Sequence, residues 1–289
     1  MLMRPHLIDP AQPVALQQSA LFVDGLRALR RDAEILPVGD CGQAAVIARR
    51  FGLFGQWRFT SRGPLWHPDA MPSDRVEALR LSRLDLINGE AEDDIVMQAA
   101  GYRMVMTPAH VASLPLLRDP AAQLAQAHVK WRNAARKLHR SGLRIARPRV
   151  TPVLLGWLLQ AEAQQQLRKR YRALPSGLTE VMVNAQPEDA LILTACRGNA
   201  VHAAILVLCH GSAATYHLAW SDTDGRAASA HHGLLMAAAD RLAQRGVTRL
   251  DLGSVDTVNA PGLARFKIGT GARIHPLGGT WLRLPGWRS

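Results

Sequence analysis

A lysine flanked by glycines is the residue of this sequence that most invites a chemical interpretation. The segment GLARFKIGTGA, residues 262–272, places Lys267 close to the end of the chain. Such a cation is either a solvated turn residue or the charge around which a reaction is built. The neighbouring Gly269-Thr270-Gly271 is a lone G-x-G without the strand, glycine loop and helix of a dinucleotide site, so it is weak evidence for one.

A row of arginines is a second candidate. Arg132, Arg136 and Arg140 recur at spacings of four, and no acidic residue occurs between Asp119 and Glu162. Like charges at this spacing repel one another by a few tenths of a kcal/mol. The row is therefore either a solvated helix face or a face that meets an anion, and the spacing does not separate these interpretations.

A predicted helix start is a third candidate. The segment GRAASAHHGLL, residues 225–235, follows a run of predicted strands and leads into a helix. The first N–H groups of a helix are unpaired and lie at the positive end of its dipole, where an anion can bind. Arg226 would add a formal charge, although most helix starts hold only water.

Other chemistries lack their patterns. His231 and His232 are adjacent and point to different sides of a helix, whereas metal ligands on a helix usually lie at i and i+4. There is no H-E-x-x-H, G-x-S-x-G or C-x-x-C, and the three cysteines lie far apart. We therefore expect no metal site, no serine nucleophile and a reducing, cytoplasmic location. We also expect neither a secretory signal nor a membrane span.

The elements that must position these residues form a mixed α/β order. Residues 121–141 have the period of one amphipathic helix, and a second helix is predicted over 152–172. Segments 190–197, 200–209 and 214–221, separated by turns, predict an antiparallel meander. A helix, a strand over 247–254, a short helix and closing strands over 272–284 follow.

Length and charge extend this description. With 289 residues, 48% of them hydrophobic, the chain can form two compact domains. We expect an N-terminal domain over 1–120, a basic connecting helix over 121–142 and a C-terminal domain over 143–289. The net charge of +12 favours acidic partners such as phosphates or nucleic acid, although solubility alone is an equally good explanation.

The order of several segments resembles the Fem-type aminoacyl/peptidyltransferases, a branch of the GNAT acyltransferase superfamily. Similar segments are SRGPLW (61–66), KWRNAARKLHRSGL (130–143), RGNAVHAAILVL with TYHLAWS, GLLMAAADRLAQRGVTRLDLG, and GLARFKIGTGA, which closely resembles the closing G-L-x-x-F-K-x-G-x-G signature. The resemblance implies an α/β fold of tandem GNAT-like (acyl-CoA N-acyltransferase) domains, the first abbreviated, with mixed central sheets and flanking helices.

The same resemblance implies an N-acyltransferase or aminoacyltransferase. Its donor would be an acyl-CoA thioester or aminoacyl-tRNA, its acceptor an amine, and it would need no covalent protein nucleophile. Lys267 maps onto the lysine of the family's closing signature, near the reacting ester or a donor phosphate. A fixed cation there stabilises the developing oxyanion by about 3–4 kcal/mol, and glycines would let the backbone of this segment approach the donor closely.

We therefore expect Lys267 and Tyr216 to be catalytic and to line one cleft with Arg226. The expected donor-binding residues are Arg226, Ser229, His231, Arg265 and Gly269, and Arg132, Arg136 and Arg140 are candidate anion ligands. The family's coenzyme A loop reads R/Q-x-x-G-x-G/A, whereas residues 226–230 here read RAASA. We expect no tightly bound cofactor, with acyl-CoA as a possible co-substrate.

Two other function classes stay open. A non-catalytic GNAT-like scaffold would bind nucleic acid or a protein partner through its basic surface, with a strongly salt-dependent affinity. A membrane-peripheral enzyme acting on lipid-linked acceptors also fits the charge, but the sequence shows no amphipathic anchor.

Overall fold

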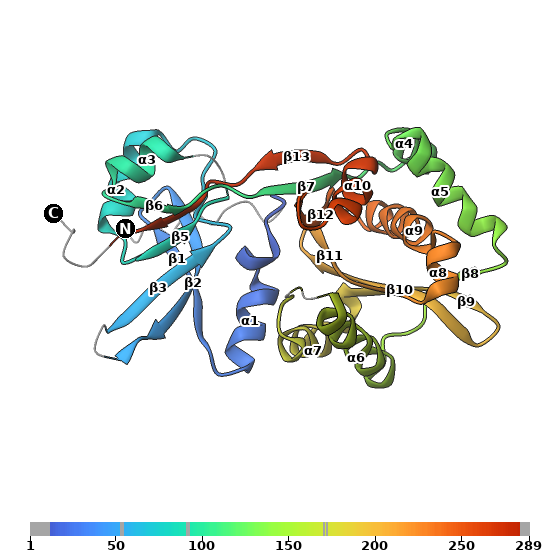
Figure 1. The fold of residues 1–289 in the computed structure, drawn as a ribbon. Helices are drawn as coiled ribbons and strands as arrows, with labels where there is room; N and C mark the ends of the chain where they lie inside the picture. The colour runs from blue at the N-terminus through green and yellow to red at the C-terminus, as the bar shows by residue number, and fades with distance from the viewer. Residues whose placement is uncertain (1–11, 53–54, 91–92, 170, 172, 284–289) are drawn as a thin grey trace. The chain divides into compact units, whose positions relative to one another are not determined.

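The computed structural model describes residues 12–52, 55–90, 93–169, 171 and 173–283, whose contacts divide the chain into two compact units (Figure 1). Unit 1 comprises Met1–His110 together with His275–Ser289, and unit 2 comprises Val111–Ile274. The chain thus passes from one unit to the other twice. This division differs from the expected boundaries at 120 and 142, because the basic helical stretch belongs to unit 2 and the last residues return to unit 1.

Unit 1 is built around a mixed sheet whose strand order is β1-β2-β3-β5-β14-β6, with β4 paired to β2. Its strands are β1 (Asp32–Val38), β2 (Gly42–Arg50), β3 (Gln56–Ser61), β4 (Leu65–Trp66), β5 (Leu86–Asn88), β6 (Arg103–Met106) and β14 (Thr280–Leu282). Its helices are α1 (Ala20–Ala28), α2 (Pro72–Leu81) and α3 (Asp94–Ala99), preceded by a 3-10 turn, η1 (Leu16–Gln18).

The strand β14 joins distant parts of the sequence. It pairs antiparallel with both β5 and β6, so residues 280–282 lie inside the sheet of unit 1. Trp281 is fully buried there, and its indole N–H donates to the carbonyl of Gly278 at 2.6 Å. The next residue, Arg283, is also buried and donates to the carbonyls of Leu79 and Ser82 at the end of α2. The closing strand therefore anchors both the sheet and the helix that covers it.

Unit 2 contains a second mixed sheet, in the order β13-β7-β12-β11-β10-β9-β8. Its strands are β7 (His110–Pro115), β8 (Arg144–Ala146), β9 (Ala190–Arg197), β10 (Ala200–His210), β11 (Ala213–Ser221), β12 (Arg249–Ser254) and β13 (Arg273–Pro276). Its helices are α4 (Pro120–Ala125), α5 (Val129–Arg140), α6 (Pro152–Lys169), α7 (Ser176–Ala185), α8 (Thr223–Ala227), α9 (Ala230–Gln244) and α10 (Pro261–Gly269), with a 3-10 turn, η3 (Pro187–Asp189).

The helices of unit 2 cover both faces of its sheet. Helices α5 and α9 lie over one face, and α6 and α7 lie over the other (Figure 1). The predicted apolar side of α5 is confirmed, since Trp131, Ala135 and Leu138 are buried in the same core as Leu234 and Leu235 of α9. The two helices approach so closely that a Cβ atom on Gly233 would lie 2.4 Å from Leu138. This packing fixes the helix that carries the arginine row.

One predicted helix is in fact two. The stretch expected as a single helix over 121–141 breaks between α4 and α5. The backbone N–H of His128 donates to Gly269, its imidazole accepts from Lys130, and Arg132 donates to the carbonyls of Ala125 and Ala127. These hydrogen bonds pair backbone groups at the helix ends that the break creates. The hydrogen bond from His128 to Gly269 is a tertiary contact, which the local hydrophobic period cannot predict.

Candidate active site

The centre of the sheet of unit 2 opens where two parallel strands diverge. Strands β11 and β12 pair only over their first three residues, up to Thr215 and Asp251. Each is irregular near that point: β11 carries an extra residue at His217 relative to β10, and β12 has a register shift beside Gly253, whose φ is +75°. Bulges and divergence release backbone groups from the ladder, so the carboxyl ends of these strands can accommodate a ligand.

Lys267 lies at this divergence. It belongs to α10 and is 6% exposed, and its Nζ donates a hydrogen bond of 2.6 Å to the carbonyl of Ser254, the last residue of β12. Burial lowers the pKa of the ammonium to about 8, and the carboxylate of Asp251 opposes this shift. The side chain is thus a buried cation that remains mostly protonated at neutral pH.

Aromatic rings hold α10 in place. The ring of Phe266 lies 5.9 Å from that of Trp131, 5.0 Å from that of His232 and 6.2 Å from that of Tyr216, measured between centroids. The indole N–H of Trp131 also donates to the carbonyl of Phe266 at 2.9 Å. These contacts connect α5, α9 and β11 to Phe266, the residue preceding Lys267, so this ring anchors α10.

The charge of a buried acid, Glu162, acts on Tyr216. Burial, and secondarily the charge of Glu162, raise the pKa of the Tyr216 phenol, which therefore stays protonated. Glu162 of α6 is 5% exposed and accepts hydrogen bonds from Tyr171 at 2.6 Å and from Gln165 at 3.2 Å. In the described part of the chain this carboxylate has no lysine or arginine partner.

The histidines of this region are held neutral. Burial lowers the pKa of His217 to about 4, and its ring shares a 2.7 Å hydrogen bond with the hydroxyl of Thr179. Burial also lowers the pKa of His232, although the nearby Ser229 carbonyl favours its protonated form. These rings therefore act as neutral polar groups rather than as cations at pH 7.

The expected donor-binding residues around α8 are engaged within the protein. Arg226 donates to the Ser221 carbonyl at 2.8 Å and to the Thr223 hydroxyl at 3.1 Å, and the ring of His231 contacts the Trp220 carbonyl at 3.0 Å. Ser229 adopts a left-handed conformation, with φ +54°, at the start of α9. The three residues lie close together in sequence, but the side chains of Arg226 and His231 are already hydrogen-bonded to backbone carbonyls.

The carboxylate of Asp222 occupies the first turn of α8. It accepts from the N–H of Gly225 at 2.8 Å and pairs with the ring of His202 at 2.9 Å. A Cβ atom on Gly225 would lie 2.1 Å from the His202 carbonyl, so glycine here allows α8 to pack on β10. This carboxylate caps α8, whereas residues 226–230 lead into α9, whose N-cap residue Ser229 makes no side-chain cap hydrogen bond.

The glycine-rich segment around Lys267 is helical rather than a loop. Its glycines serve packing: a Cβ atom on Gly269 would lie 2.6 Å from Trp131, and one on Gly271 would lie 2.6 Å from the Gln126 carbonyl. The short helix expected here is therefore confirmed as α10, and its glycines serve packing, whereas we expected them to let the backbone approach the donor. Arg265, on the same helix, is exposed.

The arginine row separates into one structural and two exposed residues. Arg132 caps α4, as described above, whereas Arg136 and Arg140 are exposed and make no hydrogen bond or ion pair with the described residues. Sequence reasoning missed Glu162 and gave His232 no role. The only sequence signal for Glu162 was that it ends a long acid-free stretch.

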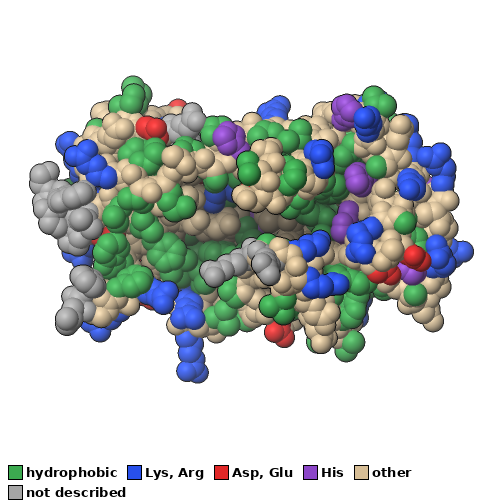
Figure 2. Space-filling view, in the orientation of Figure 1, with side chains coloured by type: hydrophobic (Ala, Val, Ile, Leu, Met, Phe, Trp, Pro, Cys, Tyr) green, Lys and Arg blue, Asp and Glu red, His purple; other side chains and the backbone are tan. Residues whose placement is uncertain are grey.

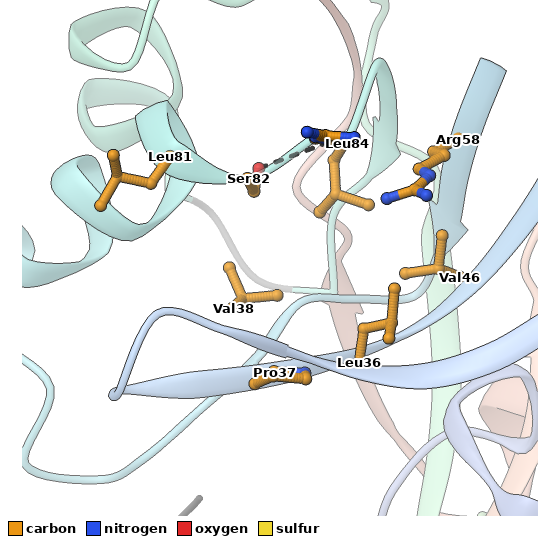
Figure 3. Close-up of a pocket in the computed structure, with 9 residues that line it drawn as sticks. Leu36, Pro37, Val38, Val46, Arg58, Leu81, Ser82 and Leu84 are labelled. Atoms are coloured by element: carbon orange, nitrogen blue, oxygen red, sulfur yellow. Dashed lines mark hydrogen bonds between the residues drawn. The ribbon is translucent and has the colours of Figure 1, made fainter. Parts of the chain in front are cut away.

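Unit 1 has a small hollow of its own. It measures about 220 Å³ and is lined by apolar side chains such as Leu36, Val38, Val46 and Leu84, with the Arg58 guanidinium directed toward it (Figure 3). Among the described residues, no group of three or more histidines, cysteines, aspartates or glutamates is arranged to hold a metal ion. Within the same ranges, no helix combines the length and hydropathy that a membrane crossing requires.

Comparison with known proteins agrees with this geometry. Residues 126–267 match the family model described as "Acetyltransferase (GNAT) domain". The crystal structure of FemX has a TM-score of 0.75 and 14% identity, covering 94% of this chain and 93% of that one. The C-terminal domain (DUF2156) of a putative lysylphosphatidylglycerol synthetase from Agrobacterium fabrum has a TM-score of 0.59 and 14% identity, covering 94% and 89%.

A tandem GNAT protein from the clavulanic acid biosynthesis pathway has a TM-score of 0.51 and 15% identity, covering 94% of this chain and 89% of that one. No curated protein sequence matches the chain. Residues 126–267 therefore match a GNAT domain model, and the chain has the fold of the tandem GNAT and Fem-type proteins. The likeness to FemX covers most of both chains and confirms the Fem-like resemblance at the level of the fold.

Proposed function

We propose that this protein transfers an acyl or aminoacyl group from an activated ester or thioester to an acceptor amine. The observation that carries the proposal is the buried ammonium of Lys267, held by Ser254 where β11 and β12 diverge. Burying a charge is costly, and a buried cation that is not needed for an ion pair often marks a functional site. The GNAT domain match supports acyl transfer as the class of reaction.

In the proposed reaction, the amine nitrogen attacks the donor carbonyl carbon and negative charge develops on the carbonyl oxygen. The Lys267 ammonium uses one N–H on Ser254, which leaves two N–H groups for that oxygen. When the intermediate collapses, the bond to the leaving oxygen or sulfur breaks, and the leaving group takes a proton while the amine loses one. The protonated phenol of Tyr216 is the second proposed hydrogen-bond donor.

Glu162 is the proposed acceptor of the amine's proton. An acceptor amine enters as an ammonium and attacks only after it loses a proton. The carboxylate of Glu162 is buried, makes hydrogen bonds only to neutral groups, and influences Tyr216. Each of its oxygens has a further lone pair for an ammonium.

Aminoacyl-tRNA is the donor that we propose, in preference to acyl-CoA. The Fem resemblance implies this donor class, and residues 226–230 depart from the coenzyme A loop pattern R/Q-x-x-G-x-G/A. Arg226, the first residue of this segment, donates to the Ser221 carbonyl and the Thr223 hydroxyl. A diphosphate would have to displace these contacts to engage the Arg226 guanidinium.

The test compares two labelled donors on the same protein. Purified protein is incubated with a set of primary amines and either radiolabelled acetyl-CoA or tRNA charged with a labelled amino-acid mixture, and transfer to the amine is measured. We expect transfer from charged tRNA, with a loss of at least 100-fold in Lys267→Ala and little change in Lys130→Ala, an exposed lysine of α5. Transfer that survives in Lys267→Ala would remove the catalytic assignment, and tRNA binding without any transfer would identify a scaffold.

A further inference from the structure

A long stretch of unit 2 is free of acidic residues. Between Asp119 and Glu162 the sequence has eight lysines and arginines and no aspartate or glutamate, so this stretch contributes +8 to the net charge of +12. Solubility can explain the total charge of the protein, but it does not explain why the positive residues cluster in one stretch, because solubility requires no particular location of the charges. The stretch includes α5, β8 and the segment that leads to α6.

The structure separates one of these eight cations from the others. Arg132 is committed to the carbonyls that end α4. The side chains of the other seven are exposed and form no ion pair or hydrogen bond with any described residue. Lys130 lies at the start of α5, and we define the remaining six as the α5–β8 surface: Arg136, Lys137, Arg140, Arg144, Arg147 and Arg149. A nearby ion pair, between Arg197 and Asp224, involves none of the six.

The scaffold beneath this surface is rigid. The opposite side of α5 is buried against α9, so Arg136 and Arg140 project from a fixed helix, one turn and roughly 6 Å apart along its axis. The chain then forms β8, an edge strand that pairs only with β9. It continues past a hollow of about 550 Å³ lined by Arg147 and Arg149, with Glu188 as its acidic member. Figure 2 shows lysine and arginine side chains along the margin that carries α5 and β8.

We infer that the α5–β8 surface binds the phosphate backbone of an RNA. The inference rests on the proposed function, because the RNA would be the carrier part of the donor, held at a surface distinct from the reacting centre at Lys267. Five of the six cations are arginines, whose planar guanidinium groups bind phosphate oxygens in pairs. A row of unpaired cations along a helix and a sheet edge suits a chain of repeated phosphates better than a single small anion.

A membrane surface fits the same charges less well. Peripheral binding to anionic lipid needs apolar side chains that insert beside the cations. Along the sequence, the exposed large hydrophobic residues that flank this surface are Val129 and Val153, and none of the described residues between them is an exposed large hydrophobic residue. The surface is therefore suited to electrostatic contact rather than to insertion.

The experiment measures binding of uncharged bulk tRNA, followed by fluorescence anisotropy at salt concentrations from 50 to 300 mM. The variant Arg136→Gln/Arg140→Gln/Arg144→Gln removes three charges of the surface. The matched control, Arg31→Gln/Arg50→Gln/Arg103→Gln, removes three exposed charges from unit 1 and gives the same net charge. Both are compared with the wild type and with Lys267→Ala, and each is checked for an unchanged thermal unfolding midpoint.

We expect the surface variant to bind tRNA at least ten-fold more weakly at 100 mM salt. We also expect the slope of log affinity against log salt to be smaller in magnitude by about 2, since each lost phosphate contact removes about 0.7. The control variant and Lys267→Ala should bind within two-fold of the wild type. Equal weakening in the control and surface variants would overturn the inference.

Vesicles containing phosphatidylglycerol serve as the competing probe. If the surface variant loses vesicle binding but keeps its affinity for tRNA, the surface binds membrane lipid and the inference fails. Retained tRNA binding in Lys267→Ala, with its transfer activity lost, shows that RNA binding and catalysis are separate. If the protein transfers acyl groups from acetyl-CoA but does not bind tRNA, the inference and the proposed donor both fail while acyl transfer stands. If it transfers from charged tRNA but the surface variant binds tRNA as the wild type does, only the inference fails.

Discussion

Replacing Lys267 by methionine removes the buried charge while keeping a side chain of similar length. Burial lowers the pKa of this lysine from 10.5 to about 8. Since one pKa unit corresponds to 1.36 kcal/mol, the charged form is disfavoured by about 3 kcal/mol in the folded state. The unfolded chain holds the proton up to a higher pH than the folded chain does. The cost is therefore fully present below about pH 8 and is relieved as the pH rises toward 10.5.

The expected result is a pH-dependent difference in stability. The unfolding free energy of the wild type should rise relative to that of Lys267→Met between pH 8 and 10, by up to about 3 kcal/mol. At pH 7 the variant should be within about 2 kcal/mol of the wild type, because the removed desolvation cost offsets the hydrogen bond lost at the Ser254 carbonyl. The proposed transfer activity should nevertheless fall by a factor of 100 to 1,000.

The assay is urea unfolding followed by circular dichroism at pH 7, 8, 9 and 10. Lys130→Met, at an exposed position, is the control and should follow the wild type at every pH. Stability curves of the wild type and Lys267→Met that stay parallel over this range would refute the reasoning. In kinetic experiments, the contribution of a protonated Lys267 should decline as the pH rises through about 8, and this decline should be absent in the methionine variant.

Three further predictions concern packing and proton transfer. Arg283→Met should lower the unfolding free energy by about 2–4 kcal/mol in urea titrations, because the buried carbonyls of Leu79 and Ser82 lose the guanidinium donor and that of Leu79 keeps, among the described residues, only the Ser82 hydroxyl, and a loss below 1 kcal/mol would contradict this role. Gly269→Ala should cost about 1–3 kcal/mol, since its Cβ atom would lie 2.6 Å from Trp131, and an unchanged thermal midpoint would show that the contact relaxes freely. Glu162→Gln should lower kcat/KM for the amine by at least ten-fold, whereas the exposed control Glu180→Gln should not, and equal effects would exclude the proposed proton acceptor.

The best predicted part of the fold is the one determined by local pattern. The three strands β9, β10 and β11 coincide with the expected meander because their turns contain Gly198 and Gly211, which adopt φ of +58° and +75°. Such glycine turns limit register and strand direction within a few residues. The local turn chemistry is therefore sufficient to predict these three strands without knowledge of any long-range contact.

The parts that escaped prediction depend on long-range contacts. The insertion of β14 between β5 and β6 pairs residues almost two hundred positions apart. A strand of three residues is too short for its hydrophobic pattern to predict which strands it pairs with. The break between α4 and α5 is stabilised by the contact of His128 with Gly269, which is equally remote in sequence. Both features follow from tertiary packing, which overrides local periodicity.

The candidate site was predicted in part for the same reason. Lys267 and Tyr216 were chosen from their sequence surroundings, and the structure places both in the divergent part of unit 2, joined through Phe266. Glu162 was not predicted as a site residue, because the sequence does not distinguish a single buried glutamate in a helix from a solvent-exposed one. Its burial depends on α6 packing over β11, which no spacing within the helix reveals.

The position of β14 has a consequence for how the chain is made. Residues 280–282 leave the ribosome long after β5 and β6, so a nascent chain holds two sheet edges that lack their shared neighbour. The strands of unit 2 find their partners within residues 110–276 and can pair earlier during synthesis. Unpaired edges invite wrong partners. The unit whose translation begins first is thus the last whose sheet can be completed.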